Sequence, residues 1–134
     1  MAWTPPDAEW QQGVFTERQA QEAGLTPHLI SRRIKDGAWQ RVAGRGWMLA
    51  GPEPNFLARA QAGMLTWPDG GLWGPTALLM WSLVEGWDPP PPVDDRPIHM
   101  AVPYSRPRQP GLMAHVMDMG SSSFETLDPK RLSA

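Results

Sequence analysis

Apolar and polar positions in the first part of the chain follow helical spacing, interrupted by turn residues. The run Thr16–Gln19 has the form of a capping box, a threonine followed three residues later by glutamine, and predicts a helix over residues 17–23. Gly24 suits the left-handed position that ends a helix, and Thr26 and Pro27 suit the start of the next one. The pattern therefore predicts two helices joined by a tight turn.

The second of these helices, which we expect to end at Gly37, has two sides of different character. Ile30 and Ile34 are four residues apart, so they predict one buried stripe. Polar and basic residues occupy the opposite side, which we expect to be exposed: His28, Ser31, Arg32 and Lys35.

Two extended segments follow, at residues 39–42 and 47–49. The four residues between them include two glycines, which permit the backbone angles of a tight hairpin. Helix, turn, helix and hairpin predict a winged helix-turn-helix DNA-binding domain over residues 6–50, and the Gly-Pro-Glu-Pro run at residues 51–54 marks its end.

The sequence after residue 54 predicts a small region of helices and strands over residues 55–120, which we expect to serve dimerisation or partner contact. Helical patterns cover residues 55–65 and 75–84, with a turn at residues 67–71 between them. In the second of these helices we expect four residues to face inward: Ala77, Leu78, Trp81 and Val84.

Two strands are expected at residues 98–102 and 112–117, joined by a basic loop. The polar residues 121–134 predict a loosely held tail. The expected fold class is α+β, a winged helix-turn-helix followed by this smaller mixed region.

Eight tryptophans are spread along the 134 residues, and we interpret most of them as core. Trp10 is placed on the apolar side of a short helix over residues 6–12, and Trp39 and Trp47 are expected to pack across the hairpin against the isoleucines of the second helix. The alternative is a stacking platform for single-stranded nucleic acid, which would use Trp39 and Trp47.

Charge distribution supports a nucleic-acid partner better than total charge does. The formal net charge is −2, whereas DNA-binding proteins usually carry a basic excess. Residues 31–45, however, hold five basic side chains against one acidic one. This local patch coincides with the predicted recognition helix and wing.

Composition sets further limits. The chain has no cysteine, so disulfides and thiolate zinc sites are excluded. Neither an apolar run long enough to span a membrane nor a signal peptide is recognisable, which predicts a cytoplasmic protein without a membrane partner. No cofactor is expected.

The N-terminal segment resembles the winged helix of AbiEi-type antitoxins. This domain is common in actinobacterial proteins. The residues that carry the resemblance are Gly13-Val14-Phe15-Thr16, Gln19-Ala20, Gly24-Leu25-Thr26, Ile30, Arg33-Ile34, Gly37, Trp39, Arg41-Val42 and Arg45-Gly46. A weaker similarity continues to about residue 130. This chain departs from the family at Met48, where tyrosine is usual, and at Gly74-Pro75, where many members have serine and histidine.

The resemblance and the motif together predict a transcriptional, antitoxin-like or mobile-element regulator that binds double-stranded DNA. Arg32 is assigned to base edges, together with His28, Ser31 and Lys35 on the same face. Three further arginines are assigned to the DNA backbone: Arg33, Arg41 and Arg45. A homodimer or a toxin partner is compatible with residues 55–120.

The alternative function is a winged-helix adaptor of an antitoxin or phage system that contacts protein and binds no DNA. Catalysis is not expected, because no converging acid, base and stabilising groups are recognisable. His99 and His115 could be neighbours on paired strands, but no third metal ligand is evident; Asp94-Asp95 lacks the partners of a metal nuclease.

Overall fold

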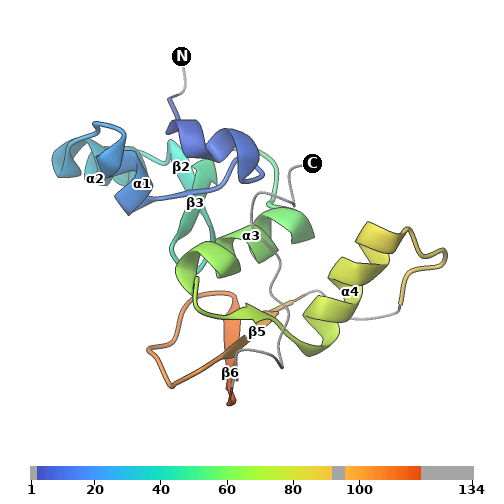
Figure 1. Ribbon diagram of the computed structural model, residues 1–134. Helices are drawn as coiled ribbons and strands as arrows, with labels where there is room; N and C mark the ends of the chain where they lie inside the picture. Colours follow the sequence, from blue (N-terminus) through green and yellow to red (C-terminus); the bar gives the residue numbers. More distant parts are fainter. Residues whose placement is uncertain (1–2, 92–95, 119–134) are drawn as a thin grey trace.

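The computed structural model describes residues 3–91 and 96–118 (Figure 1). Its N-terminal part consists of a short 3-10 helix, two short α-helices and a small antiparallel sheet. The order along the chain is η1 (Pro6–Trp10), β1 (Phe15–Thr16), α1 (Glu17–Glu22), α2 (Pro27–Lys35), β2 (Trp39–Ala43) and β3 (Gly46–Leu49). β3 lies between the other two strands, in the order β1-β3-β2. The predicted helix, turn, helix and hairpin are confirmed in this order.

The second part contains two longer helices and a second three-stranded sheet. Its elements are α3 (Phe56–Thr66), β4 (Gly71–Leu72), α4 (Gly74–Glu85), β5 (Ile98–Val102) and β6 (Leu112–Val116). β5 lies in the middle of this sheet, antiparallel to β4 and parallel to β6. The predicted α+β class is confirmed.

Packing of the first core follows the predicted stripe. Phe15, Ile30, Trp39 and Trp47 are buried in one cluster with Ala8 and Ala20, and Ile34 packs against it. The rings of Phe15 and Trp39 meet edge to face, with centroids 4.7 Å apart. The prediction that Trp39 and Trp47 pack against the isoleucines of α2 is therefore confirmed.

α3 connects the two sheets, and in Figure 1 it lies between them. It contacts β2 and β3 on one side and β5 on the other. Small residues make the first contact possible: Ala58 and Ala62 pack on Val14 and Ala43. On the second side Phe56, Ala60 and Met64 join Met80, Ile98 and Met100 in the largest core. The proposed division of the chain at residues 51–54 stays a prediction, since contacts cross it.

The expectation that most tryptophans are core is wrong. Only Trp39, Trp47 and Trp67 are buried. Trp10 is 39% exposed, because the short 3-10 helix η1 buries Ala8 instead. Trp81 and Trp87 are also exposed.

The predicted inward face of α4 is wrong as well. Leu78, Trp81 and Val84 are exposed, and Ala77 is half-buried. Thr76, Met80 and Ser82 are the buried residues of this helix. The predicted and the observed buried sides differ because α4 is apolar on more than one side. Spacing alone therefore did not select the side that packs on β5.

Two features of the second sheet were not predicted. Gly71 and Leu72, placed partly in a turn, form the edge strand β4 and pair with Ala101 and Met100. Parallel pairing of β5 with β6 also has no signal in the sequence, because the connection of residues 103–111 is shorter than a usual crossover. The predicted tail at residues 121–134 lies outside the described residues.

Candidate nucleic-acid interface

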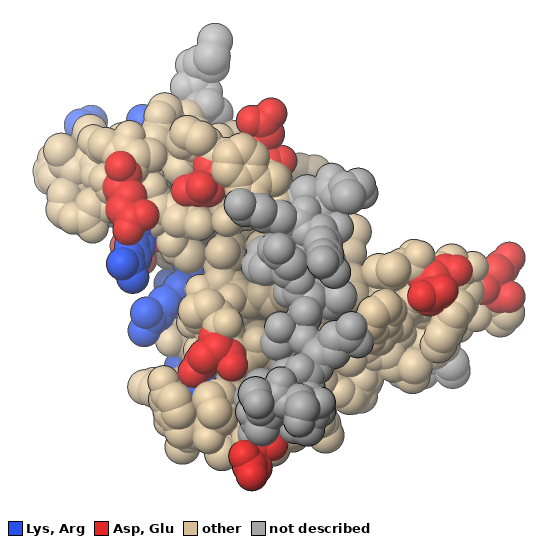
Figure 2. Space-filling model, in the orientation of Figure 1, with Lys and Arg blue, Asp and Glu red and all other residues tan. Residues whose placement is uncertain are grey.

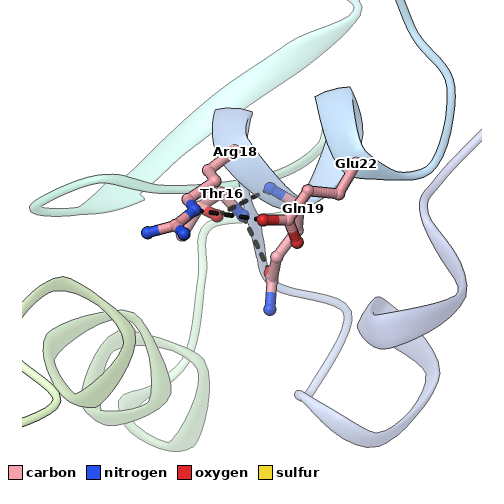
Figure 3. A network of polar contacts seen from close by, with 4 residues as sticks. All are labelled: Thr16, Arg18, Gln19 and Glu22. Atoms are coloured by element: carbon pink, nitrogen blue, oxygen red, sulfur yellow. Dashed lines mark hydrogen bonds and ion pairs between the residues drawn. The ribbon is translucent and has the colours of Figure 1, made fainter.

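The capping box forms as predicted and fixes the start of α1 (Figure 3). Gln19 N–H donates to the hydroxyl of Thr16 at 3.1 Å, and Thr16 N–H donates to the side-chain oxygen of Gln19 at 3.1 Å. Buried Gln11 also shares hydrogen bonds with the Gln19 amide. Together with the burial of Ala20 in the core, these contacts fix the position of this six-residue helix.

α2 begins at the predicted residue and ends at Lys35, one residue before the predicted end. The hydroxyl of Thr26 accepts the N–H of Leu29 at 3.2 Å, and Pro27 occupies the first helical position. After Lys35 the chain turns at Gly37, whose φ is +76°. Ile30 then points into the core, so the basic side of α2 faces outward.

The side of α2 proposed to read bases is exposed. His28, Ser31, Arg32 and Lys35 all belong to the exposed class. Arg32 lies 3.7 Å from the carboxylate of Asp36, and both side chains are more than 60% exposed, so water and salt screen this pair strongly. The other three have no side-chain hydrogen bond or ion pair with the residues that the structure describes.

Two of the arginines assigned to the DNA backbone bend back onto the protein. Arg33 is half-buried, with its guanidinium 6.0 Å from the centre of the Trp3 ring. The guanidinium of Arg41 stacks 4.5 Å from the centre of the Trp47 ring and donates to the carbonyl of Gly44. Both guanidinium groups are therefore held against the surface of the N-terminal part.

The turn of the β2–β3 hairpin is anchored to the second half of the molecule. Gly44 N–H donates to the carbonyl of Pro110 at 2.7 Å, and Arg45 N–H donates to the hydroxyl of Thr66 at 2.9 Å. Gly44 has a φ of +52°, and a Cβ there would lie 2.8 Å from Leu112. The turn is thus buried at Gly44, while Arg45 stays exposed.

The anchored turn brings Arg45 next to the basic loop between β5 and β6. A cavity of about 420 Å³ is lined by side chains from both parts, including Arg45, Asp69, Tyr104, Arg106 and Gln109. Figure 2 shows Lys and Arg side chains along one side of the molecule, from the region of α1 down toward this loop. Basic groups from separate parts of the sequence therefore share one side.

Arg106 occupies a fixed position in this loop. Two of its nitrogens donate to the two carboxylate oxygens of Asp69 at 2.8 and 3.0 Å, and its guanidinium lies 4.3 Å from the centre of the Tyr104 ring. The hydrogen bond from Arg106 lowers the pKa of Asp69, and the same contact raises the pKa of Arg106. The sequence showed only a basic loop, because Asp69 is 37 residues away.

Arg108, in the same loop, is exposed and has no side-chain hydrogen bond or ion pair with the described residues. Sequence reasoning did not include it among the candidate site residues. The Arg-Pro-Arg run was its only signal, and the run alone does not show that the loop lies beside the hairpin.

The two strand histidines are neighbours. His99 Nδ1 and His115 Nε2 are 2.9 Å apart, and the His115 ring stacks on Trp73 with centroids 4.1 Å apart. Within residues 3–91 and 96–118, no group of three His, Asp or Glu side chains is placed to hold a metal ion. Asp94 and Asp95 lie outside the described residues.

Residues 8–46 match the family model described as "Transcriptional regulator, AbiEi antitoxin". This match confirms the predicted resemblance over less than half of the chain. The AbiEi match supports a regulatory role. The family's description names a regulator and does not name a class of enzyme. No curated protein and no solved structure matches the chain. Among the described helices, none has the length and apolar character needed to cross a membrane.

Proposed function

We propose that residues 6–50 form a winged helix-turn-helix that binds duplex DNA, and that the protein is a transcriptional regulator. In this proposal α2 enters the major groove, and the β2–β3 hairpin is the wing beside it. The element order, the sheet order β1-β3-β2 and the AbiEi match support this assignment. The observation that carries it is the outward basic face of α2 directly before the hairpin.

The residues divide by their place on this motif. Arg32 has an exposed planar guanidinium held only by a screened contact to Asp36, so it can turn to a guanine edge. His28, Ser31 and Lys35 share its face. Arg45 is the exposed residue of the wing turn and would contact phosphates or the minor groove.

Arg33 and Arg41 would serve the DNA backbone from fixed positions. Each guanidinium lies over a tryptophan ring, Trp3 or Trp47, which limits its freedom before binding. A phosphate contact from a held side chain loses less conformational entropy than one from a free side chain. The stacked arginines therefore contact the DNA backbone, while the exposed face of α2 around Arg32 reads the sequence.

The test is fluorescence anisotropy of a labelled duplex with the full chain over a series of salt concentrations. If about three or four phosphates are neutralised, log K should fall with log salt with a slope of about −2.7 to −3.6. Lys35→Ala should weaken binding, whereas Arg96→Ala, outside residues 6–50, controls for the loss of one positive charge.

Failure to bind any duplex at low salt would contradict the proposal. It would favour the adaptor hypothesis, in which the same surface contacts a protein. Partial exposure of Leu29 on α2, at 39%, is the feature that such a contact would use.

A further inference from the structure

α4 presents an apolar surface to solvent that the rest of the described molecule does not cover. Leu78 is 41% exposed, Trp81 37% and Val84 59%. Most monomeric proteins expose large apolar side chains singly, so a group of them on one helix indicates an interaction surface. We refer to these three residues as the α4 stripe.

Helical geometry places the α4 stripe on one side of the helix. Its residues are spaced by three, and at 100° per residue they span about 120°. The side that faces the core carries the three buried residues of α4, Thr76, Met80 and Ser82, which are 1%, 0% and 1% exposed. Leu83 and Trp87 add further exposed apolar area at the end of the helix. A helix that is apolar on both sides is normally buried on both sides.

The two ends of α4 differ in charge. Glu85 is four residues after Trp81 and therefore lies beside the α4 stripe at the C-terminal end. No lysine or arginine occurs in this helix, and its first turn has neither an acidic residue nor a side-chain cap at Trp73. Within α4 itself, no side chain therefore offsets the partial positive charge of the N-terminal end. In Figure 2 the visible surface of α4 has acidic atoms only toward its C-terminal end.

We propose that the α4 stripe is a homodimer interface on which a second copy of the chain packs its own α4 in the antiparallel direction. Trp81 lies near the two-fold axis in this arrangement, with Leu78 facing the region of the partner's Glu85. Each Glu85 then lies near the positive start of the partner helix. Parallel packing would instead bring the two Glu85 carboxylates together. The charge pattern therefore selects a second copy of this helix and its direction.

This interface does not depend on DNA binding, because α4 lies outside residues 6–50. The test is sedimentation equilibrium of the full chain from about 1 to 100 μM, a range that brackets micromolar dissociation constants. Val84→Asp places a charge in the apolar contact and should raise the dimer dissociation constant by at least about tenfold. Circular dichroism of both proteins checks that the variant is folded.

Val116→Asp is the matched control, because Val116 is a valine of similar exposure, 55%, at the end of β6 and outside α4. It should leave the dimer intact. A wild-type chain that stays monomeric over the whole range overturns the proposal. So does a dimer that Val116→Asp dissociates and Val84→Asp leaves unchanged, which would place the contact at the β6 edge.

Direction is tested by cross-linking, since the chain has no cysteine of its own. Leu78→Cys and Glu85→Cys variants are mixed and oxidised. Antiparallel packing predicts that mixed disulfides exceed both homodisulfides, whereas an excess of homodisulfides overturns the antiparallel arrangement. In addition, Glu85→Gln should weaken an antiparallel dimer several-fold and would strengthen a parallel one.

Discussion

The hydroxyl of Thr66, at the end of α3, accepts the backbone N–H of Arg45 at 2.9 Å. The same hydroxyl donates to the carbonyl of Ala62 at 2.7 Å, so both of its roles are used. Thr66 is only 8% exposed, and water is therefore a poor substitute for either partner. This contact joins the turn of the β2–β3 hairpin to the last residue of α3, 21 positions later in the chain.

Thr66→Val should lower the free energy of unfolding by about 1–3 kcal/mol, because the Arg45 N–H loses its partner at a site with little access to water. Thr66→Ser keeps the hydroxyl and should cost less. Urea unfolding followed by tryptophan fluorescence measures both. A larger loss for Thr66→Ser than for Thr66→Val would show that the methyl group, and not the hydrogen bond, anchors the turn.

Trp39→Ala should lower the free energy of unfolding by about 3–5 kcal/mol, because the ring is 3% exposed and packs edge to face on Phe15. Trp10→Ala, at a ring that is 39% exposed, is the comparison and should cost clearly less. Thermal unfolding by circular dichroism gives both values. An unchanged melting temperature for Trp39→Ala would instead revive the hypothesis of a stacking platform.

The Asp69–Arg106 pair predicts a defined pH dependence. Hydrogen bonding to Arg106 lowers the pKa of Asp69 from its ordinary value of 3.8. A carboxyl group with a lowered folded-state pKa stabilises the protein above its unfolded-state value, and the contribution is lost as pH falls through the folded-state value. The pair is partly exposed at Asp69, 38%, so we expect a contribution of about 1 kcal/mol or less.

Asp69→Asn removes this contribution. The difference in unfolding free energy between wild type and variant should be constant near neutral pH and shrink toward zero as pH falls below 3.8. Urea unfolding at a series of pH values measures it, and Asp118→Asn, at an exposed position, controls for the loss of one carboxylate. A difference that grows toward acid pH would contradict the assigned direction.

Arg32 and Arg45 should have separable roles if the proposed function holds. Arg32→Ala should weaken binding to the preferred site by about 1–3 kcal/mol and flatten sequence preference, because a base contact is lost. Arg45→Ala should weaken all duplexes alike and reduce the salt slope by about one. Competition titrations with specific and scrambled duplexes measure both. The opposite pattern would mean that the wing reads the sequence.

Local signals in the sequence determined the N-terminal elements. The capping box at Thr16 and Gln19, the turn at Gly24 and the start at Thr26 each depend on residues within one helical turn, so they could be predicted from spacing. The buried stripe of α2 was also predictable, because its other side is polar and leaves one choice for the core. The exposed basic face followed from the same choice.

Tertiary structure alone decided the rest. α4 is apolar on more than one side, and only its packing on β5 determined that Met80 is buried and Trp81 exposed. The pairing of Arg106 with Asp69, and of the hairpin turn with Thr66, joins residues 37 and 21 positions apart. Such contacts depend on where whole elements come to rest. Spacing along the chain carries no information about them, because periodicity describes only the side of one element and not its neighbour.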